Sequence, residues 1–200
     1  MQRSQITLSP MQGSWEQAKT YCSKSETSLG PVFTNEVLYD GSDIKMLDEE
    51  DARFPWQQKL INFIIDETTS NIKTPDDRTI VWITDSSGNT GKSKLVKWCC
   101  INFNSIVKIS FGTSSQLRSA LIAAGPRDVY FVDIPRTLGS DDSIQSLMSA
   151  LEDLKNGYIV SSMYGKCESL IINSPHIVVF LNKECPEFMM SKDRWLKLAI

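Results

Sequence analysis

The residues best suited to chemistry form a glycine-rich segment, GNTGKS, at positions 88–93. It follows the apolar run TIVWITD and leads directly into a stretch with helical character. Glycines let backbone N–H groups turn toward an anion, and a helix N-terminus adds partial positive charge. Lys92 would then reach the β- and γ-phosphates of ATP, and the Ser93 hydroxyl would ligate Mg²⁺. The expected nucleotide contacts are Ser87, Gly88, Asn89, Thr90, Gly91, Lys92, Ser93 and Lys94.

The full phosphate-loop pattern, GxxxxGK[ST], has a glycine where this chain has Ser86. A glycine-rich turn without a ligand is therefore the alternative interpretation. The order strand, loop, helix favours phosphate binding, because that order brings the loop and the helix N-terminus to the same anion.

A metal-binding carboxylate is expected at the end of a neighbouring strand, and DVYFVDIPR supplies Asp133 after an apolar run. In open α/β sheets, ligands bind at the carboxyl ends of the strands. Asp133 and Ser93 are therefore the expected magnesium ligands, although a simple turn aspartate is the alternative. The next residue is Ile134, so a second acid that could activate water is absent at that position. Either another residue assists Asp133, or turnover is slow.

Two further polar residues fit a nucleotide site. Asn182 ends the apolar run HIVVFLN, where an amide can orient the attacking water or sense the γ-phosphate. Arg194, in MSKDRWLKLAI, is a candidate arginine finger. A capping asparagine and a solvent-exposed arginine are the respective alternatives.

The segment LKNGYIVSSMYGKCESLII predicts two strands around a turn at Tyr164-Gly165-Lys166. A lysine at a hairpin tip can contact a phosphate, and a tyrosine beside it can stack on a base. Lys155 and Lys166 would supply the local positive charge for nucleic acid that the whole chain, at net charge −3, does not have. A plain solvated hairpin is the alternative.

The elements that must position these residues alternate along the chain. Strands are expected over 79–85, 105–111, 128–133 and 176–182, with helices over about 92–103, after a serine N-cap to Gly125, and from about 140 to Gly157. This alternation predicts an α/β fold with a mostly parallel sheet and helices on both faces. A shorter helical unit, at about 48–70 and with Pro55 in its first turn, precedes it.

Composition narrows the compartment and the class of site. The five cysteines form no CxxC pair and His176 is the single histidine, which argues against a disulfide framework, a zinc site or a histidine-pair metal site. No apolar run approaches the ~18 residues of a membrane span. A reducing intracellular compartment, cytosolic or nuclear, fits best.

Taken together, SxGNTGKS, VYFVDIPR, LKNGYIVSSMYGK, SPHIVVFLN and SKDRW resemble one family in order and spacing. The chain resembles the replication-associated (Rep) proteins of circular single-stranded DNA viruses and related plasmids, whose C-terminal half is a superfamily 3 helicase with an AAA+-like P-loop fold. The resemblance covers about residues 12–200. It implies a ring of six subunits, Arg194 acting on a neighbour's nucleotide, the Lys166 hairpin lining the pore, and a host-nuclear location.

Upstream, SWEQAKTYCSKSET resembles the third motif of the HUH endonuclease that precedes the helicase in these proteins. Tyr21 would be the strand-cleaving residue, with Lys24 assisting. The family's metal-binding histidines would lie before the start of this chain, so the resemblance implies a truncated remnant without nuclease activity. Apart from the family, Tyr21 and Lys24 only mark one face of an amphipathic helix.

The resulting hypothesis divides the chain into a nuclease remnant (1–34), a linker with a helical oligomerisation segment (35–74) and a P-loop ATPase domain (75–200). The expected function is ATP-dependent translocation or unwinding on single-stranded DNA, or RNA, in rolling-circle replication. One alternative is a nucleotide- and nucleic-acid-binding ring with little hydrolysis. Another is a small-molecule P-loop kinase, against which the Lys166 hairpin and the lack of an arginine-rich lid both argue.

Overall fold

The computed structural model describes residues 14, 17, 54–110, 112–134, 141–165 and 167–200. The chain divides into two units, Met1–Ile44 and Lys45–Ile200. In the first, Ser14 and Gln17 exchange two side-chain-to-backbone hydrogen bonds of 3.0 and 3.3 Å, the reciprocal pattern found at helix N-termini. Tyr21 and Lys24 lie outside the described residues.

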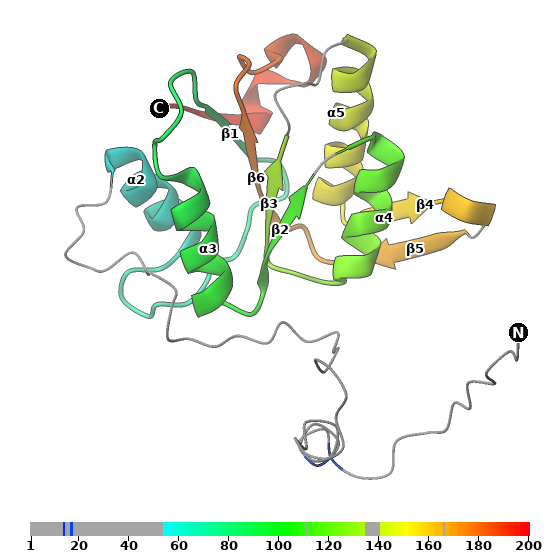
Figure 1. Cartoon of the computed structure of the whole chain (residues 1–200), viewed down its shortest axis with the longest axis horizontal. Helices are drawn as coiled ribbons and strands as arrows, with labels where there is room; N and C mark the ends of the chain where they lie inside the picture. Colours follow the sequence, from blue (N-terminus) through cyan, green and yellow to red (C-terminus); the bar gives the residue numbers. More distant parts are fainter. Residues whose placement is uncertain (1–13, 15–16, 18–53, 111, 135–140, 166) are drawn as a thin grey trace, which may run out of the picture. The chain divides into compact units, whose positions relative to one another are not determined.

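A five-stranded sheet with the order β2-β3-β6-β1-β7 forms the centre of the second unit (Figure 1). Each neighbouring pair of its strands is parallel. The strands are β1 (Ile80–Thr84), β2 (Ile106–Ser110), β3 (Val129–Asp133), β6 (His176–Leu181) and β7 (Trp195–Ala199). The predicted α/β class and parallel sheet are confirmed.

The burial of each strand follows its place in the sheet. The central strands β1, β3 and β6 are buried along nearly their whole length, because helices cover both of their faces. The edge strand β2 is only partly buried, with Ile106 and Ile109 buried on opposite faces of the sheet and Lys108 exposed. These apolar runs are what made the strands visible in the sequence.

Two helices lie on each side of the sheet (Figure 1). On one side, α2 (Pro55–Ile64) and α3 (Lys92–Asn102) pack their apolar residues against β1, β3 and β6. On the other, α4 (Ser114–Ala124) and α5 (Asp141–Lys155) cover the sheet's second face. Among the described residues, no helix has the length and apolar character needed to cross a membrane.

The structure corrects two predicted helix limits. The helix expected to reach residue 70 ends at Ile64, because Ile65 turns to an extended conformation and forms an antiparallel bridge with Ile72. The N-cap of α4 is Thr113 and not a serine, and its hydroxyl accepts a 3.2 Å hydrogen bond from the Gln116 N–H. The predicted stop at Gly125 is confirmed, with φ at +68°.

The predicted hairpin is also confirmed. β4 (Tyr158–Ser161) pairs antiparallel with β5 (Glu168–Ile171), and a short 3₁₀ turn, η1 (Met163–Gly165), lies between them. The hairpin packs on α4 and α5, on the side of the sheet opposite α3 (Figure 1). Strand β7, in contrast, was not predicted, because we interpreted the segment around Arg194 only as a polar turn.

Lys155 does not lie on the surface, contrary to the prediction that it supplies positive charge for nucleic acid. It is 1% exposed at the end of α5, and its Nζ donates a 2.8 Å hydrogen bond to the carbonyl of Pro175. The nearest carboxylate, on Asp76, lies 3.9 Å away. Burial lowers the pKa of Lys155 to about 8. Lys155 is therefore a buried structural residue that ties α5 to the segment before β6.

This burial predicts a pH dependence of stability. Between the folded pKa of about 8 and the ordinary value of 10.5, the unfolded chain binds more protons at Lys155 than the folded chain does. The stability of the native protein should therefore rise, relative to Lys155→Met, by about 1 kcal/mol per pH unit across this window. Urea unfolding of both proteins from pH 7 to pH 10 measures this difference. Parallel curves for the two proteins would contradict it.

Candidate nucleotide site

The carboxyl ends of three neighbouring strands open into one cavity of about 630 Å³. The glycine-rich loop follows β1, Asp133 ends β3, and Asn182 follows β6, which lies between those two strands. The described residues that line the cavity are Phe54, Gly88, Asn89, Thr90, Gly91, Lys92, Ser93, Lys94, Val96, Lys108, Asp133, Ile134, Phe180 and Asn182. The structure thus brings together nearly all of the residues predicted to bind nucleotide, and Asp133 with them.

The backbone of the loop shows why its residue types matter. Gly88, Asn89 and Gly91 have φ values of +75°, +56° and +80°, a region that glycine and asparagine enter most easily. Gly91 is the N-cap of α3, so the helix begins at Lys92 itself. The helix N-terminus, with its partial positive charge, therefore opens directly into the cavity.

Helix α2 holds the loop in place from the side. The indole N–H of Trp56 donates to the carbonyl of Thr90, and the Gln57 amide donates to the carbonyl of Gly91, both at 3.1 Å. Both donors are buried side chains. The helix that we predicted as an oligomerisation segment thus packs on the glycine-rich loop of its own chain, whereas its role in assembly stays a prediction.

Asp85, which the sequence analysis missed, lies beneath the loop. Its Oδ1 accepts backbone N–H bonds from Ser87 and Gly88 at 3.1 and 2.7 Å. Its Oδ2 accepts a 2.9 Å bond from the Thr90 hydroxyl and forms an ion pair with Lys92. Burial alone would raise the pKa of Asp85, but the Lys92 ammonium and these donors hold it well below its usual range. The carboxylate is therefore charged at neutral pH.

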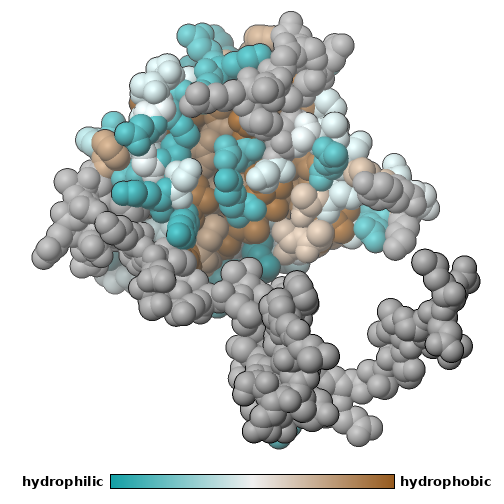
Figure 2. Space-filling view, in the orientation of Figure 1, coloured by the Kyte–Doolittle hydropathy of each residue, from teal (hydrophilic) through white to brown (hydrophobic). Residues whose placement is uncertain are grey.

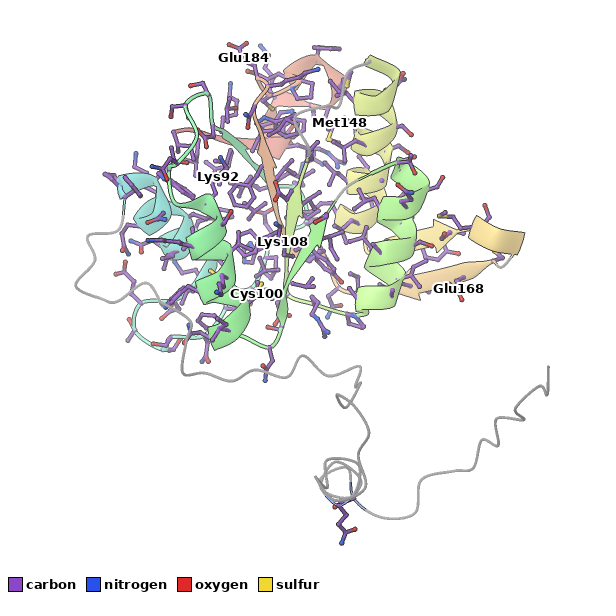
Figure 3. All side chains as sticks on the ribbon, in the orientation of Figure 1. Lys92, Cys100, Lys108, Met148, Glu168 and Glu184 are labelled. Atoms are coloured by element: carbon purple, nitrogen blue, oxygen red, sulfur yellow. The ribbon has the colours of Figure 1, made fainter. Side chains whose placement is uncertain are left out.

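A second lysine, Lys108 on β2, was also missed. Its Nζ lies 2.7 Å from Asp133 Oδ2, and both side chains are partly exposed, at 41% and 44%. Lys92 at the start of α3 and Lys108 on β2 lie near each other on the α3 side of the molecule, whereas Glu168 of the hairpin lies beyond α4 (Figure 3). Figure 2, in the same orientation, shows hydrophilic residues lying over an otherwise apolar area of the surface between the two pairs of helices.

Phe54, the third missed residue, lines the cavity beside Gly91 and is 49% exposed. A half-exposed aromatic ring next to the glycine-rich loop offers a flat apolar surface of the kind on which a nucleotide base can stack. The sequence carried a signal for it, because Phe54 directly precedes the proline that starts α2.

Other predicted site residues lie elsewhere. Arg194 immediately precedes β7, which is in parallel register with β1, so it lies at the amino edge of the sheet, opposite the cavity. Its side chain is 18% exposed, and its Nη1 is 3.8 Å from Glu152 of α5. Tyr164 belongs to η1, but its side chain and all of Lys166 lie outside the described residues.

The predicted magnesium ligands fit the chemistry of that ion. Ser93 and Asp133 line the same cavity, and hydroxyl and carboxylate oxygens are hard ligands of the kind that Mg²⁺ prefers. Within the described part of the chain, no group of three or more His, Cys, Asp or Glu side chains could hold a metal. Phosphate oxygens and water would have to complete the coordination shell.

Several known proteins resemble the chain. Para-Rep C6 of the Subterranean clover stunt C6 alphasatellite is 28% identical over 141 residues, covering 70% of this chain and 45% of its own length. Para-Rep C1 of the Faba bean necrotic yellows C11 alphasatellite is 28% identical over 144 residues, with the same coverage. Para-Rep C9 of the Faba bean necrotic yellows C9 alphasatellite is 25% identical over 224 residues, covering 94% of this chain and 75% of its own length.

The chain thus spans somewhat less than half the length of the first two relatives. No protein-family model matches it. The similarities support a Rep-like protein, in agreement with the resemblance seen in the sequence.

The crowding around Gly91 predicts a loss of stability on substitution. A Cβ at this position would lie 2.7 Å from the Gln57 amide nitrogen and 3.2 Å from the Phe54 ring. Gly165 is the matched control, because it has a similar φ of +73° but, among the described residues, no atom within 4 Å of its Cβ position. We expect Gly91→Ala to lower the free energy of unfolding by about 2 kcal/mol or more, and Gly165→Ala by about 1 kcal/mol. Equal losses in urea unfolding would contradict the tight packing of α2 on the loop.

Proposed function

We propose that the chain is the ATPase part of a Rep-like replication protein, which binds ATP with Mg²⁺ and uses its hydrolysis to move along single-stranded DNA in rolling-circle replication. The observation that carries this proposal is the cavity at the carboxyl ends of β1, β3 and β6. There a glycine-rich loop and a helix N-terminus meet Asp133 and Asn182. The similarity to Para-Rep proteins supports the replication context.

Each residue of the cavity has a distinct task in this proposal. Lys92 and the backbone N–H groups at the start of α3 bind the β- and γ-phosphates. Lys108, which pairs with Asp133, lines the same cavity and would add a further positive charge near the phosphate chain. Asn182 holds the attacking water in line with the γ-phosphate. Phe54 contacts the base.

Ser93 and Asp133 would hold Mg²⁺, which supplies charge neutralisation on the phosphates when it is bound. Asp133 is paired with Lys108. To ligate Mg²⁺, the Asp133 carboxylate would have to leave this lysine. Both side chains are partly exposed, which leaves room for such a change.

One observation favours a second candidate function, a ring that binds nucleotide and nucleic acid but hydrolyses slowly. Asp133 is the one carboxylate among the described residues that line the cavity, and the following Ile134 is buried at 4% exposure. A water-activating carboxylate is thus not among the lining residues. Slow hydrolysis with normal ATP binding would support this candidate.

The hairpin and the ring are further parts of the proposal. Single-stranded DNA would contact the β4–β5 hairpin, where Lys166 and Tyr164 were predicted to bind it, and six subunits would surround the strand. RNA is the alternative ligand. Comparing the ATPase rate with single-stranded DNA, with RNA and without nucleic acid, alongside sedimentation of the complexes, would identify the ligand and the assembly.

The first experiment tests the nucleotide site. Because Lys92 supplies a point charge to the phosphates, Lys92→Ala should abolish hydrolysis and weaken ATP binding by on the order of 100-fold. Lys97→Ala is the matched control, since it removes an exposed lysine of the same helix from outside the cavity. Calorimetry with Mg-ATP on both folded variants measures the affinities. Unchanged affinity in Lys92→Ala would refute the site.

The second experiment tests whether Arg194 acts on a neighbouring subunit. If it does, Arg194→Ala should lower turnover by on the order of 10³-fold, and mixing with Lys92→Ala subunits should restore part of it. Glu152→Gln is the matched control, because it removes the ion pair of Arg194 within its own chain but keeps the guanidinium. Equal losses in both variants, with no gain on mixing, would show a structural ion pair instead.

A further inference from the structure

The two carboxylate oxygens of Asp85 have different interaction partners. Oδ1 accepts the N–H groups of Ser87 and Gly88 and so shapes the first turn of the loop. Oδ2 faces the other way along the loop, where it accepts from the Thr90 hydroxyl and pairs with Lys92. A substitution that neutralises the charge can therefore be separated from one that destroys the turn.

The ion pair involves the lysine that the proposed nucleotide needs. Two anions that share one ammonium group in a site shielded from water repel each other strongly, because the local dielectric constant is low. A phosphate group at Lys92 would therefore meet the charge of Asp85 within a few ångströms. The Asp85 carboxylate thus places a negative charge close to the position where the phosphate would bind.

The exposed fractions of the two side chains show which member of the Lys92–Asp85 ion pair can move toward a ligand. The Lys92 side chain is 22% exposed and lines the cavity, whereas the Asp85 side chain is 1% exposed. A ligand in the cavity can reach the lysine but not the carboxylate. When Lys92 turns toward the ligand, Ser87, Gly88 and Thr90 still donate to Asp85, so the buried charge keeps hydrogen-bond partners.

We propose that Asp85 is an internal competitor of the nucleotide: it pairs with Lys92, loses it to an entering phosphate and takes it back as the product leaves. This inference rests on the proposed nucleotide site. In that site, the competition from Asp85 would weaken the binding of nucleotide and speed the release of ADP. Asp85 is thus a positioning residue, since it acts through Lys92 and not on the substrate.

Asp85→Asn tests the proposal. The amide oxygen can still accept from Ser87 and Gly88, so the turn is kept while the charge is lost. We expect the variant to bind ADP on the order of tenfold more tightly than the unchanged chain, mainly through slower dissociation. Inorganic pyrophosphate should show the same gain, because the effect concerns phosphate and not the base. Calorimetry gives the affinities, and stopped-flow release of a fluorescent ADP gives the dissociation rate.

Asp66→Asn is the matched control. Asp66 also accepts two backbone N–H groups, from Thr68 and Thr69, both at 2.9 Å, but it lies in the exposed turn after α2 and does not line the cavity. The same change of charge and turn chemistry there should leave ADP affinity and release unchanged. A gain in both variants would show a general effect of net charge and would overturn the proposal.

The possible failures can be told apart. If the unchanged chain binds neither ADP nor pyrophosphate, the nucleotide site itself is refuted, and the competitor with it. If the unchanged chain binds both and folded Asp85→Asn binds them equally or more weakly, only the competitor is refuted. Should circular dichroism show that Asp85→Asn does not fold, Asp85→Ser, which keeps a short acceptor for the Gly88 N–H, replaces it under the same criteria.

Discussion

The parallel direction of the five strands is the constraint on which the candidate site depends. In such a sheet every carboxyl end meets the same edge, so groups far apart in the sequence become neighbours without any special contact between them. Because β6 lies between β1 and β3, Asn182 emerges between the glycine-rich loop and Asp133. Arg194 and Lys155 lie at the other edge of the sheet. There Arg194 forms an ion pair with Glu152, and Lys155 donates a hydrogen bond to the carbonyl of Pro175.

Charge balance inside the cavity is the second organising feature. Lys92 is paired with Asp85, and Lys108 is paired with Asp133. An unpaired ammonium or carboxylate in a partly enclosed site would be costly, so the pairs allow the loop to keep its shape before any ligand arrives. The pairs differ in exposure. Asp133 can turn to another cation at the surface of the cavity, whereas Asp85 stays in place.

Much of this arrangement could be predicted from sequence, because the strands are apolar runs and the loop has its own residue signature. The central strands were placed within a residue or two, and Lys92, Asp133 and Asn182 were brought into one site as expected. Strand β7 was missed because it has no buried residue and Lys197 interrupts its apolar side chains, so it does not form a continuous apolar run. Its pattern overlaps with that of a polar turn.

Two of the remaining misses, Lys155 and Lys108, share one physical cause. The burial of Lys155 depends on Pro175 and Asp76, which lie 20 and 79 positions away in the sequence. Likewise, the role of Lys108 depends on its ion pair with Asp133, which belongs to another strand. Local patterns do not record such long-range pairings, so a lysine at a helix end was interpreted as exposed.

The hydrogen bonds from α2 to the loop also have a mechanical consequence. Trp56 and Gln57, in the first turn of α2, donate hydrogen bonds to the carbonyls of Thr90 and Gly91. Two short, directional links therefore tie the position of α2 to the position of the glycine-rich loop. A displacement of either element would change the geometry of the other.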